Sequence, residues 1–312
     1  MTMDDIAAYR PTDALLDEEW SGRTAVLERV LCADARPAAG DVLAVRRGRR
    51  RWIGAAAVAS AAAVALVLGL VLPSGTPGAA PNAAAATLEK LAVRAAASPA
   101  DLVRPGQFRH LRDKEVQTGD QPHTTVIEDW TSYDGTVWSK RIGFPFAGQT
   151  AYLQFLAADR GSDFSSPSPK FLAGLPTDVG GLRDYLRSHV SGSSSRDEAV
   201  FVAVGDMLRG GMASPELRAA AIRVLERTPH ITAASGADSL GRPALVITFY
   251  DRKARANETQ ALLFDPNTSV LLEEQQRATD GGSFGFTSTY TEASTVDAVP
   301  AAVIANAEVQ TD

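Results

Sequence analysis

One stretch of the sequence, from Trp52 to Leu72, contains no charged residue and constrains the chain more than any other feature. At a helical rise of about 1.5 Å per residue it is long enough to cross a bilayer core, which needs roughly 20 apolar residues. The stretch therefore predicts a single transmembrane helix, and a buried helix of a soluble domain is the less favoured alternative. The residues that we expect to anchor it in lipid are Trp52, Ile53, Leu66, Leu68, Leu70 and Leu72.

Positive charge on one side of this stretch predicts its orientation. A cluster of arginines directly precedes it, whereas residues 73–78 after it carry no charge. Because positively charged flanks of a membrane helix stay in the cytoplasm, we expect the N-terminus inside the cell and the C-terminal part outside it. The residues that set this topology are Arg46, Arg47, Arg49, Arg50 and Arg51.

A cleaved secretory signal is the competing interpretation, because paired arginines before an apolar run are typical of twin-arginine signals. Two features favour an uncleaved anchor. The apolar stretch begins far from the first residue. It is also longer than the about 7–15 apolar residues of a signal peptide.

The predicted helix divides the chain into segments. Residues 1–51 form a short cytoplasmic segment, 73–82 form a linker rich in Pro, Gly and Ala, and 83–312 form an extracytoplasmic domain, with the helix at 52–72. The formal net charge of the chain is −6, and acidic and basic residues balance within 1–51. The acidic excess therefore lies outside, and it disfavours nucleic acid as a partner. The lipid bilayer is the partner that the topology predicts.

The spacing of apolar residues after the linker predicts an α+β domain. A helix is expected over 83–97. Strands are expected over 108–118, 124–133 and 136–143, with Asp134-Gly135 as a hairpin turn. Three helices follow, over 178–190, over 196–209 and from the Ser214 cap to Pro229, and then about five strands. In the last strand, Tyr290 and Thr289 belong to opposite faces, which predicts one buried and one solvated side. This order favours one curved antiparallel sheet, a half-barrel, with the helical block on one face.

None of the patterns in the sequence predicts catalysis. Residues 281–285 match the G-x-S-x-G pattern of serine hydrolases, but strands are expected on both sides of them and no histidine follows His230. The adjacent carboxylates Glu128-Asp129 and Glu273-Glu274 lie on expected strands, where neighbouring side chains face opposite sides of the sheet. We therefore expect no catalytic activity, no cofactor and no metal site.

Several short motifs together give the chain a family resemblance. They are Trp130…Asp134-Gly135…Trp138, Phe171–Asp178, Gly205–Arg209, Ser214–Ala220 and Leu263–Pro266. The combination resembles an uncharacterised family of actinobacterial single-pass membrane proteins. The exterior of that family looks like the half-barrel of the lipoprotein carrier LolA and of the sigma-factor regulator RseB. The resemblance implies a signalling role beside extracytoplasmic-function sigma factors. The cytoplasmic segment here is shorter than a usual anti-sigma domain and lacks its zinc-binding His/Cys pattern, and no cysteine lipobox is present.

Topology and resemblance lead to three functional hypotheses. The first is a membrane-anchored sensory or regulatory module that binds an apolar ligand or a protein segment outside and a cytoplasmic regulator, such as a sigma factor, inside. The second is a tethered carrier of lipid or lipoprotein with a passive cytoplasmic tail. A cell-wall-modifying enzyme is the remote third hypothesis.

The predicted topology can be tested with protease added to intact protoplasts. We expect digestion to remove most of the mass of the chain and to leave a protected fragment of residues 1–72, because the bilayer shields what lies behind it. Survival of the long C-terminal part, or a mature chain that begins beyond Leu72, would contradict the topology.

Overall fold

The computed structural model describes residues 81–99, 101–146, 149–157 and 163–310. The expected membrane helix, its arginine cluster, the cytoplasmic segment and nearly all of the linker lie outside these residues. Within the described part of the chain, no helix combines the length and the apolar character needed to cross a membrane.

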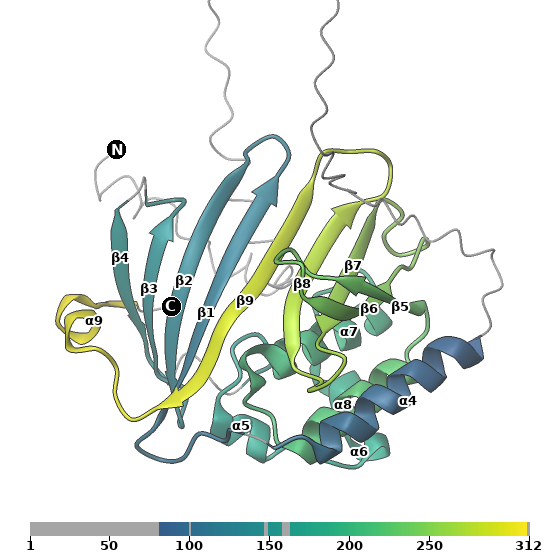
Figure 1. The fold of residues 1–312 in the computed structure, drawn as a ribbon, viewed down its shortest axis with the longest axis horizontal. Coiled ribbons are helices and arrows are strands. Elements are labelled where there is room, and N and C mark those ends of the chain that lie inside the picture. Colours follow the sequence, from purple (N-terminus) through teal and green to yellow (C-terminus); the bar gives the residue numbers. More distant parts are fainter. Residues whose placement is uncertain (1–80, 100, 147–148, 158–162, 311–312) are drawn as a thin grey trace, which may run out of the picture. The chain divides into compact units, whose positions relative to one another are not determined.

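The described residues form a ten-stranded sheet and a set of helices (Figure 1). The helices are α4 (Pro81–Ala97), α5 (Pro169–Ala173), α6 (Val179–His189), α7 (Arg196–Leu208), the 3₁₀ turn η1 (Arg209–Gly211), α8 (Pro215–Glu226) and α9 (Ala301–Asn306). The strands are β1 (Phe108–Thr118), β2 (His123–Ser132), β3 (Val137–Gly143), β4 (Thr150–Phe155), β5 (Ile231–Ala237), β6 (Pro243–Phe249), β7 (Glu258–Phe264), β8 (Leu271–Ala278), β9 (Gly285–Val296) and β10 (Glu308–Gln310).

The sheet has the strand order β10-β4-β3-β2-β1-β9-β8-β7-β6-β5. All neighbours pair antiparallel except β10, which pairs with β4 in parallel. The sheet thus consists of two runs of sequential strands, β1–β4 and β5–β9, joined where β1 pairs with β9. A register shift between Arg112 and Asp113 interrupts that pairing, and such a bulge bends a sheet locally.

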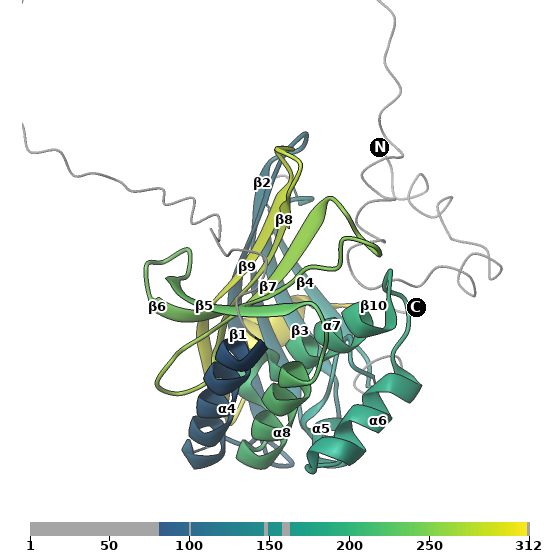
Figure 2. The same cartoon turned by 90° about the vertical axis from the view of Figure 1, so that its right-hand side faces the viewer.

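The helical block covers only one of these two runs. Buried leucines of α4, α6 and α8 and the apolar face of α7 form one core with the inward side chains of β6–β8, among them Ile247, Leu262 and Phe264. Helices α4 and α8 lie side by side in both ribbon views (Figures 1 and 2). A bidentate ion pair between Arg223 and Glu89 joins them on the solvent side. The core of the domain therefore lies over β5–β9.

The local sequence explains the ends of these helices. The side-chain oxygens of Ser168, Asp178, Ser195 and Ser214 each accept a hydrogen bond from a backbone N–H in the first turn of the following helix. Such caps satisfy donors that have no partner within the helix. After α7, Gly210 and Gly211 have φ values of 72° and 67°, a left-handed conformation that favours glycine. The chain thus turns sharply between α7 and α8.

The opposite face of the sheet is covered at two places, which corrects the expectation of helices on a single face. Trp130 and Trp138 are direct cross-strand partners, and Trp130 packs with Val299 and Val303 from the C-terminal segment that contains α9. The two tryptophans are packing residues, as the sequence predicts. At the other end, Glu273 accepts hydrogen bonds from Ser239 and Thr289.

The burial of Thr289 shows that the expected solvated face of the last strand was wrong at this point. The loop between β5 and β6 crosses this face, and Arg242 in that loop donates to the carbonyl oxygens of Leu272 and Tyr290. Sequence alternation describes a strand in isolation, and it does not indicate which loop will fold over it.

Most expected elements are confirmed, and four elements were not predicted, namely β4, α5, α9 and β10. Strand β1 has the predicted bounds, and the other strands and helices differ from the expected bounds by a few residues at their ends. The stretch 143–176 shows no period in the sequence, yet it contains β4 and the short helix α5. The Asp134 turn is longer than two residues, because the N–H of Ser132 donates to the carbonyl oxygen of Thr136 and leaves residues 133–135 in the loop. The Asp134 carboxylate accepts hydrogen bonds from Ser132 and Thr136 within this loop.

Helix α7 lies so close to β7 that its glycine has no room for a side chain. A Cβ built on Gly205 would lie 2.9 Å from Cδ2 of Leu262. We expect Gly205→Val to lower the free energy of unfolding by about 1–3 kcal/mol through overpacking. Chemical denaturation of the full chain measures this.

Gly180→Val in α6 is the matched control, because the nearest atom to its Cβ is Asp178 Oδ1 at 3.5 Å and the residue is exposed. An equal loss in both variants would show that helix propensity, rather than close packing, sets the cost at position 205.

Candidate functional site

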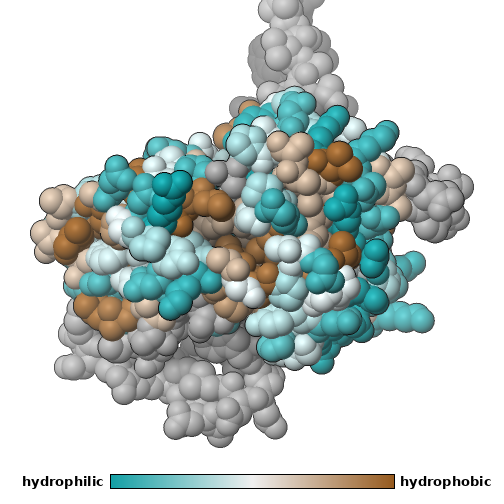
Figure 3. Space-filling view, turned by 90° about the horizontal axis from the view of Figure 1, so that it is seen from below, coloured by the Kyte–Doolittle hydropathy of each residue, from teal (hydrophilic) through white to brown (hydrophobic). Residues whose placement is uncertain are grey.

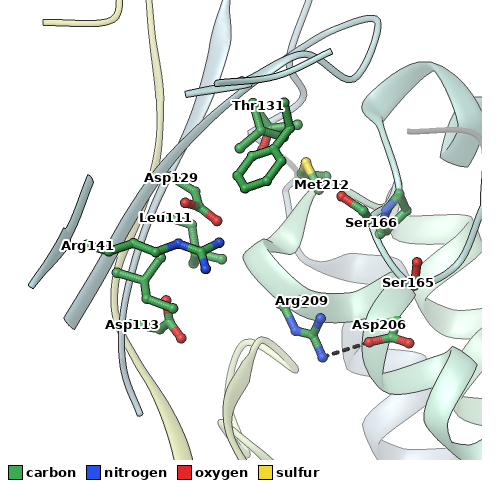
Figure 4. A pocket seen from close by; sticks show the side chains of 14 residues that line it. Leu111, Asp113, Asp129, Thr131, Arg141, Ser165, Ser166, Asp206, Arg209 and Met212 are labelled. Atoms are coloured by element: carbon green, nitrogen blue, oxygen red, sulfur yellow. Dashed lines mark ion pairs between the residues drawn. The ribbon is translucent and has the colours of Figure 1, made fainter. Parts of the chain in front are cut away.

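A cleft lies where the helical block faces the run β1–β4. It is a cavity of about 70 Å³ bounded by the inner face of β1–β3, by Phe155 at the end of β4, by residues 165–167, and by the end of α7 with η1 (Figure 4). A volume of this size holds roughly five water molecules or one small side-chain group. The described part of the cleft is therefore suited to a small group.

Register places the side chains of the sheet wall in rows. Leu111 of β1 pairs with Asp129 of β2, and Asp129 pairs with Ser139 of β3. In the next row, Asp113 pairs with Ile127, which pairs with Arg141. Because side chains alternate between faces along a strand, both rows face the cleft. The sheet wall of the cleft therefore carries charged side chains among apolar ones.

The helix wall is built around Arg209, the first residue of η1. Its guanidinium makes a bidentate pair with Glu274 of β8, at 2.9 Å from Nε to Oε1 and 2.9 Å from Nη2 to Oε2. Nη2 also lies 2.7 Å from Oδ1 of Asp206, one helical turn back. Tyr290 Oη of β9 lies 2.9 Å from Nε of Arg209 and donates to Glu274. One ionic network thus connects α7, β8 and β9 at the edge of the cleft.

The surroundings of this network shift the pKa values of its members. Burial lowers the pKa of Arg209, but the nearby charges of Glu274 and Asp206 outweigh it and raise that pKa well above its ordinary value. Burial also raises the pKa of Tyr290 well above its ordinary value, against the opposing effect of Arg209, and Glu274 adds to the rise. Arg209 is therefore charged and the Tyr290 phenol neutral at every physiological pH.

A second arginine fixes η1 to the sheet. Arg109 of β1 is 6% exposed, and its Nε donates to the carbonyl oxygen of Gly210 while Nη1 lies 3.0 Å from Oδ2 of Asp101. Burial lowers the pKa of Arg109, and Asp101 opposes this shift. The end of α7 is thus held from both β1 and β8.

Two charged side chains in the cleft have few protein partners. Nε of Arg141 donates to Ser139 Oγ at 3.1 Å, and the guanidinium lies over the Phe155 ring, 5.6 Å from its centre. Oδ1 of Asp129 is shielded from solvent and has no hydrogen-bond partner among the described residues. Figure 4 shows both side chains extending from the sheet into the cleft.

The carboxylate pairs singled out in the sequence are separated by the sheet, as expected from strand alternation. Asp129 faces the cleft, whereas Glu128 is on the other face with Lys140 and His110. Glu274 binds Arg209, whereas Glu273 is buried on the opposite face under the β5–β6 loop. Each pair therefore supplies one carboxylate to this side of the sheet.

The other sequence candidates lie away from the cleft. Residues 281–284 lie in the loop between β8 and β9, as the hairpin interpretation predicts. The ring of His110 stacks on Trp130, that of His189 stacks on Tyr185, and that of His123 lies beside Phe144. In the described ranges, no group of three His, Cys, Asp or Glu residues could hold a metal ion. The membrane-anchor and topology-setting residues lie outside the described part.

Sequence reasoning missed the residues that build the cleft. Arg141, Asp129 and Arg209 come from three separate segments, and only pairing and packing bring them together. One signal was present, because the Gly205–Arg209 motif contains the close-packed glycine and both Asp206 and Arg209. Figure 3 shows hydrophobic residues on the lower face in small patches among hydrophilic ones.

Comparison with solved structures finds weak likenesses. Two structures of MucB in complex with MucA, one of them from Pseudomonas aeruginosa, are 16% identical over 70% of this chain, with TM-scores of 0.29 and 0.28. This chain spans 59% and 57% of the length of those two chains. A lipoprotein-sorting protein domain from Vibrio parahaemolyticus is 7% identical, with a TM-score of 0.21, over 72% of this chain and 96% of that one. Scans against family models and curated proteins find no match. At these TM-scores we draw no functional conclusion from the likenesses.

The ionic network predicts a large cost for removing its cation. We expect Arg209→Met to lower the free energy of unfolding by about 3–5 kcal/mol, because Glu274 is left partly buried without a counter-charge. Replacing Glu274 with Met as well should recover most of this loss. Chemical denaturation of the full chain measures both effects.

Arg187→Met is the control, since this ion pair with Asp197 is on the surface and should cost at most about 1 kcal/mol. If the double variant is no more stable than Arg209→Met, the network does not act as a unit.

Proposed function

We propose that this chain is a membrane-anchored, extracytoplasmic regulatory module that binds a segment of a partner protein in the cleft between α7–η1 and the inner face of β1–β3. In this proposal residues 52–72 are the anchor in the cell membrane. The cytoplasmic segment 1–51 contacts a regulator such as a sigma factor.

The observation that carries this proposal is that the helical block covers only part of the inner face of the sheet. The helical block buries the inner face of β5–β9 but leaves β1–β3 lining an open cleft. The cleft wall combines apolar side chains with Asp129 and Arg141, whose polar atoms have few partners within the described residues. Mixed walls of this kind suit a peptide, which offers both apolar side chains and hydrogen-bonding groups.

The lipid or lipoprotein carrier is the alternative function. A carrier needs a largely apolar cavity that encloses most of its ligand. The described cleft is small and has three aspartates and two arginines in its lining. These features favour a protein segment over an acyl chain.

We also propose that the chain has no catalytic role. Asp113 and Asp129 are the carboxylates of the cleft that lie on neighbouring strands, and their arrangement could suggest a glycosidase pair. Asp113, however, accepts a hydrogen bond from Ser288 at 3.0 Å, which fits a structural role.

A photo-crosslinker at position 212 tests whether the cleft holds a protein segment. We expect the full chain, expressed in its own cells with a benzoyl-phenylalanine in place of Met212, to form one discrete protein adduct. The same substitution at Lys114, an exposed residue of β1, should not form it. Adding Val137→Trp should abolish the adduct by filling the cleft. An adduct with lipid alone would favour the carrier, and adducts unaffected by Val137→Trp would contradict cleft binding.

A deletion in the cytoplasmic segment also distinguishes the regulatory module from the carrier. Deleting residues 1–45 should abolish signalling while leaving the adduct at position 212 intact. Full function after this deletion would contradict the regulatory proposal and favour a passive tail.

A further inference from the structure

The cleft presents an acceptor and a cation side by side, and this pattern limits what can bind there. Asp129 pairs with Ser139 and Ile127 pairs with Arg141, so Asp129 and Arg141 are diagonal neighbours on adjacent strands. Diagonal neighbours on one face are close enough for long side chains to reach the same ligand. One bound group can therefore contact both side chains. This inference rests on the proposed function, because it names the chemistry of the segment bound in the same cleft.

Asp129 contributes an acceptor without a donor. Its Oδ1 is shielded from solvent, and no described residue donates a hydrogen bond to it. Shielded polar atoms are nearly always paired in folded proteins. Because Oδ1 of Asp129 is shielded, lacks a partner and lines the cleft, we expect a hydrogen-bond donor from outside the described residues to bind it.

Arg141 contributes donors without acceptors. In the part of the chain that the structure describes, its hydrogen bond to Ser139 uses Nε, and its Cζ lies over the Phe155 ring. These two contacts fix the orientation of the guanidinium. No hydrogen bond to a described residue uses the terminal nitrogens, which extend into the cleft (Figure 4).

Charge then decides between classes of ligand. A carboxylate would pair with Arg141 but would face Asp129, with Asp113 and Asp206 also in the lining. An ammonium group would pair with Asp129 but would face Arg141. Next to the shielded Oδ1 of Asp129 and the guanidinium of Arg141, an unmatched charge on the ligand is costly. A neutral group with one donor and one acceptor satisfies both side chains.

We propose that the cleft recognises the primary carboxamide of an Asn or Gln side chain carried by the partner segment. The amide NH₂ donates to Oδ1 of Asp129, and the amide oxygen accepts from a terminal nitrogen of Arg141. Leu111, Val137 and Met212 supply apolar contact for the neighbouring atoms of the segment. The cavity of about 70 Å³ admits a group of this size.

Four peptides that differ only in their central residue test this inference. They carry Gln, Glu, Lys or Met in an otherwise identical sequence of small apolar residues. The full chain, labelled with ¹³C at its methionine methyl groups, is titrated with each peptide, and the signal of Met212 is followed. The chain has four methionines, and Met212→Leu identifies the signal. We expect the Gln peptide to bind at least tenfold more tightly than the other three.

Two variants invert the preference if both contacts are real. Asp129→Asn removes the acidic partner, and the Glu peptide should then bind more tightly than the Lys peptide. Arg141→Met removes the cation, and the order of these two peptides should reverse. Should either variant fail to unfold cooperatively, the peptide series on the native chain still decides.

The outcomes separate this inference from the proposed function. Equal binding of all four peptides, blocked by Val137→Trp, would overturn the carboxamide inference and leave cleft binding in place. Tightest binding of Glu or Lys to the native chain would overturn it as well. Absence of binding by every peptide would also overturn it, and the crosslink at position 212 would then decide the proposed function alone.

Discussion

The pairing of β1 with β9 is the interaction on which the rest of this domain depends. It joins two strands that are far apart in the sequence, and all the helices of the block from α5 to α8 come between them in the chain. Closing this pair places the end of α7 directly over the junction. Arg109 of β1 and Glu274 of β8 then hold η1 from both sides, through Gly210 and Arg209. The cleft exists because the junction is fixed at this point and the run β1–β4 continues beyond the helices.

The distribution of polar residues follows from this arrangement. Over β5–β9 the inner face that α7 and α8 bury is mostly apolar, and its polar residues Gln260 and Glu274 are paired with Glu198 and Arg209 of the helical block. Over β1–β3 the same face carries aspartates and an arginine, which would be costly beneath a packed helix. The change from a mostly apolar to a polar inner face therefore marks the point on the sheet where the helical block ends. In our proposal, the acidic charges of the cleft favour a peptide over a lipid as the occupant.

Much of the fold could be predicted from local signals. The helix from Ser214 was predicted from its cap, its proline and its apolar face, and these are features that act over a few residues. Strand β1 was predicted from its alternating pattern. The loop between β5 and β6 could not be predicted, because Thr289 looks like a solvated threonine until Glu273 and that loop bury it. The short strand β4 was missed for a similar reason, since its residues gain their pattern only by pairing with β3 and β10.

The cleft was harder to predict than the fold. Strand alternation correctly assigned Asp129 and Glu274 to the faces opposite their neighbours, but it could not show that Arg141 and Arg209 come from opposite walls of one cavity. That relation depends on the β1–β9 pairing, which links segments at long sequence separation. The membrane anchor and its orientation, by contrast, are predicted from the uncharged stretch 52–72 and the arginines before it, and they stay a prediction of the sequence.

Hydrogen exchange tests the central claim, that the cleft holds a protein segment, most directly. The full chain is compared in its own membranes and after purification in detergent. We expect slower exchange in the membranes at residues 165–168 and 209–213, which face the cleft from the helix side, with unchanged exchange in α6. Equal exchange at these residues in both preparations would contradict the account.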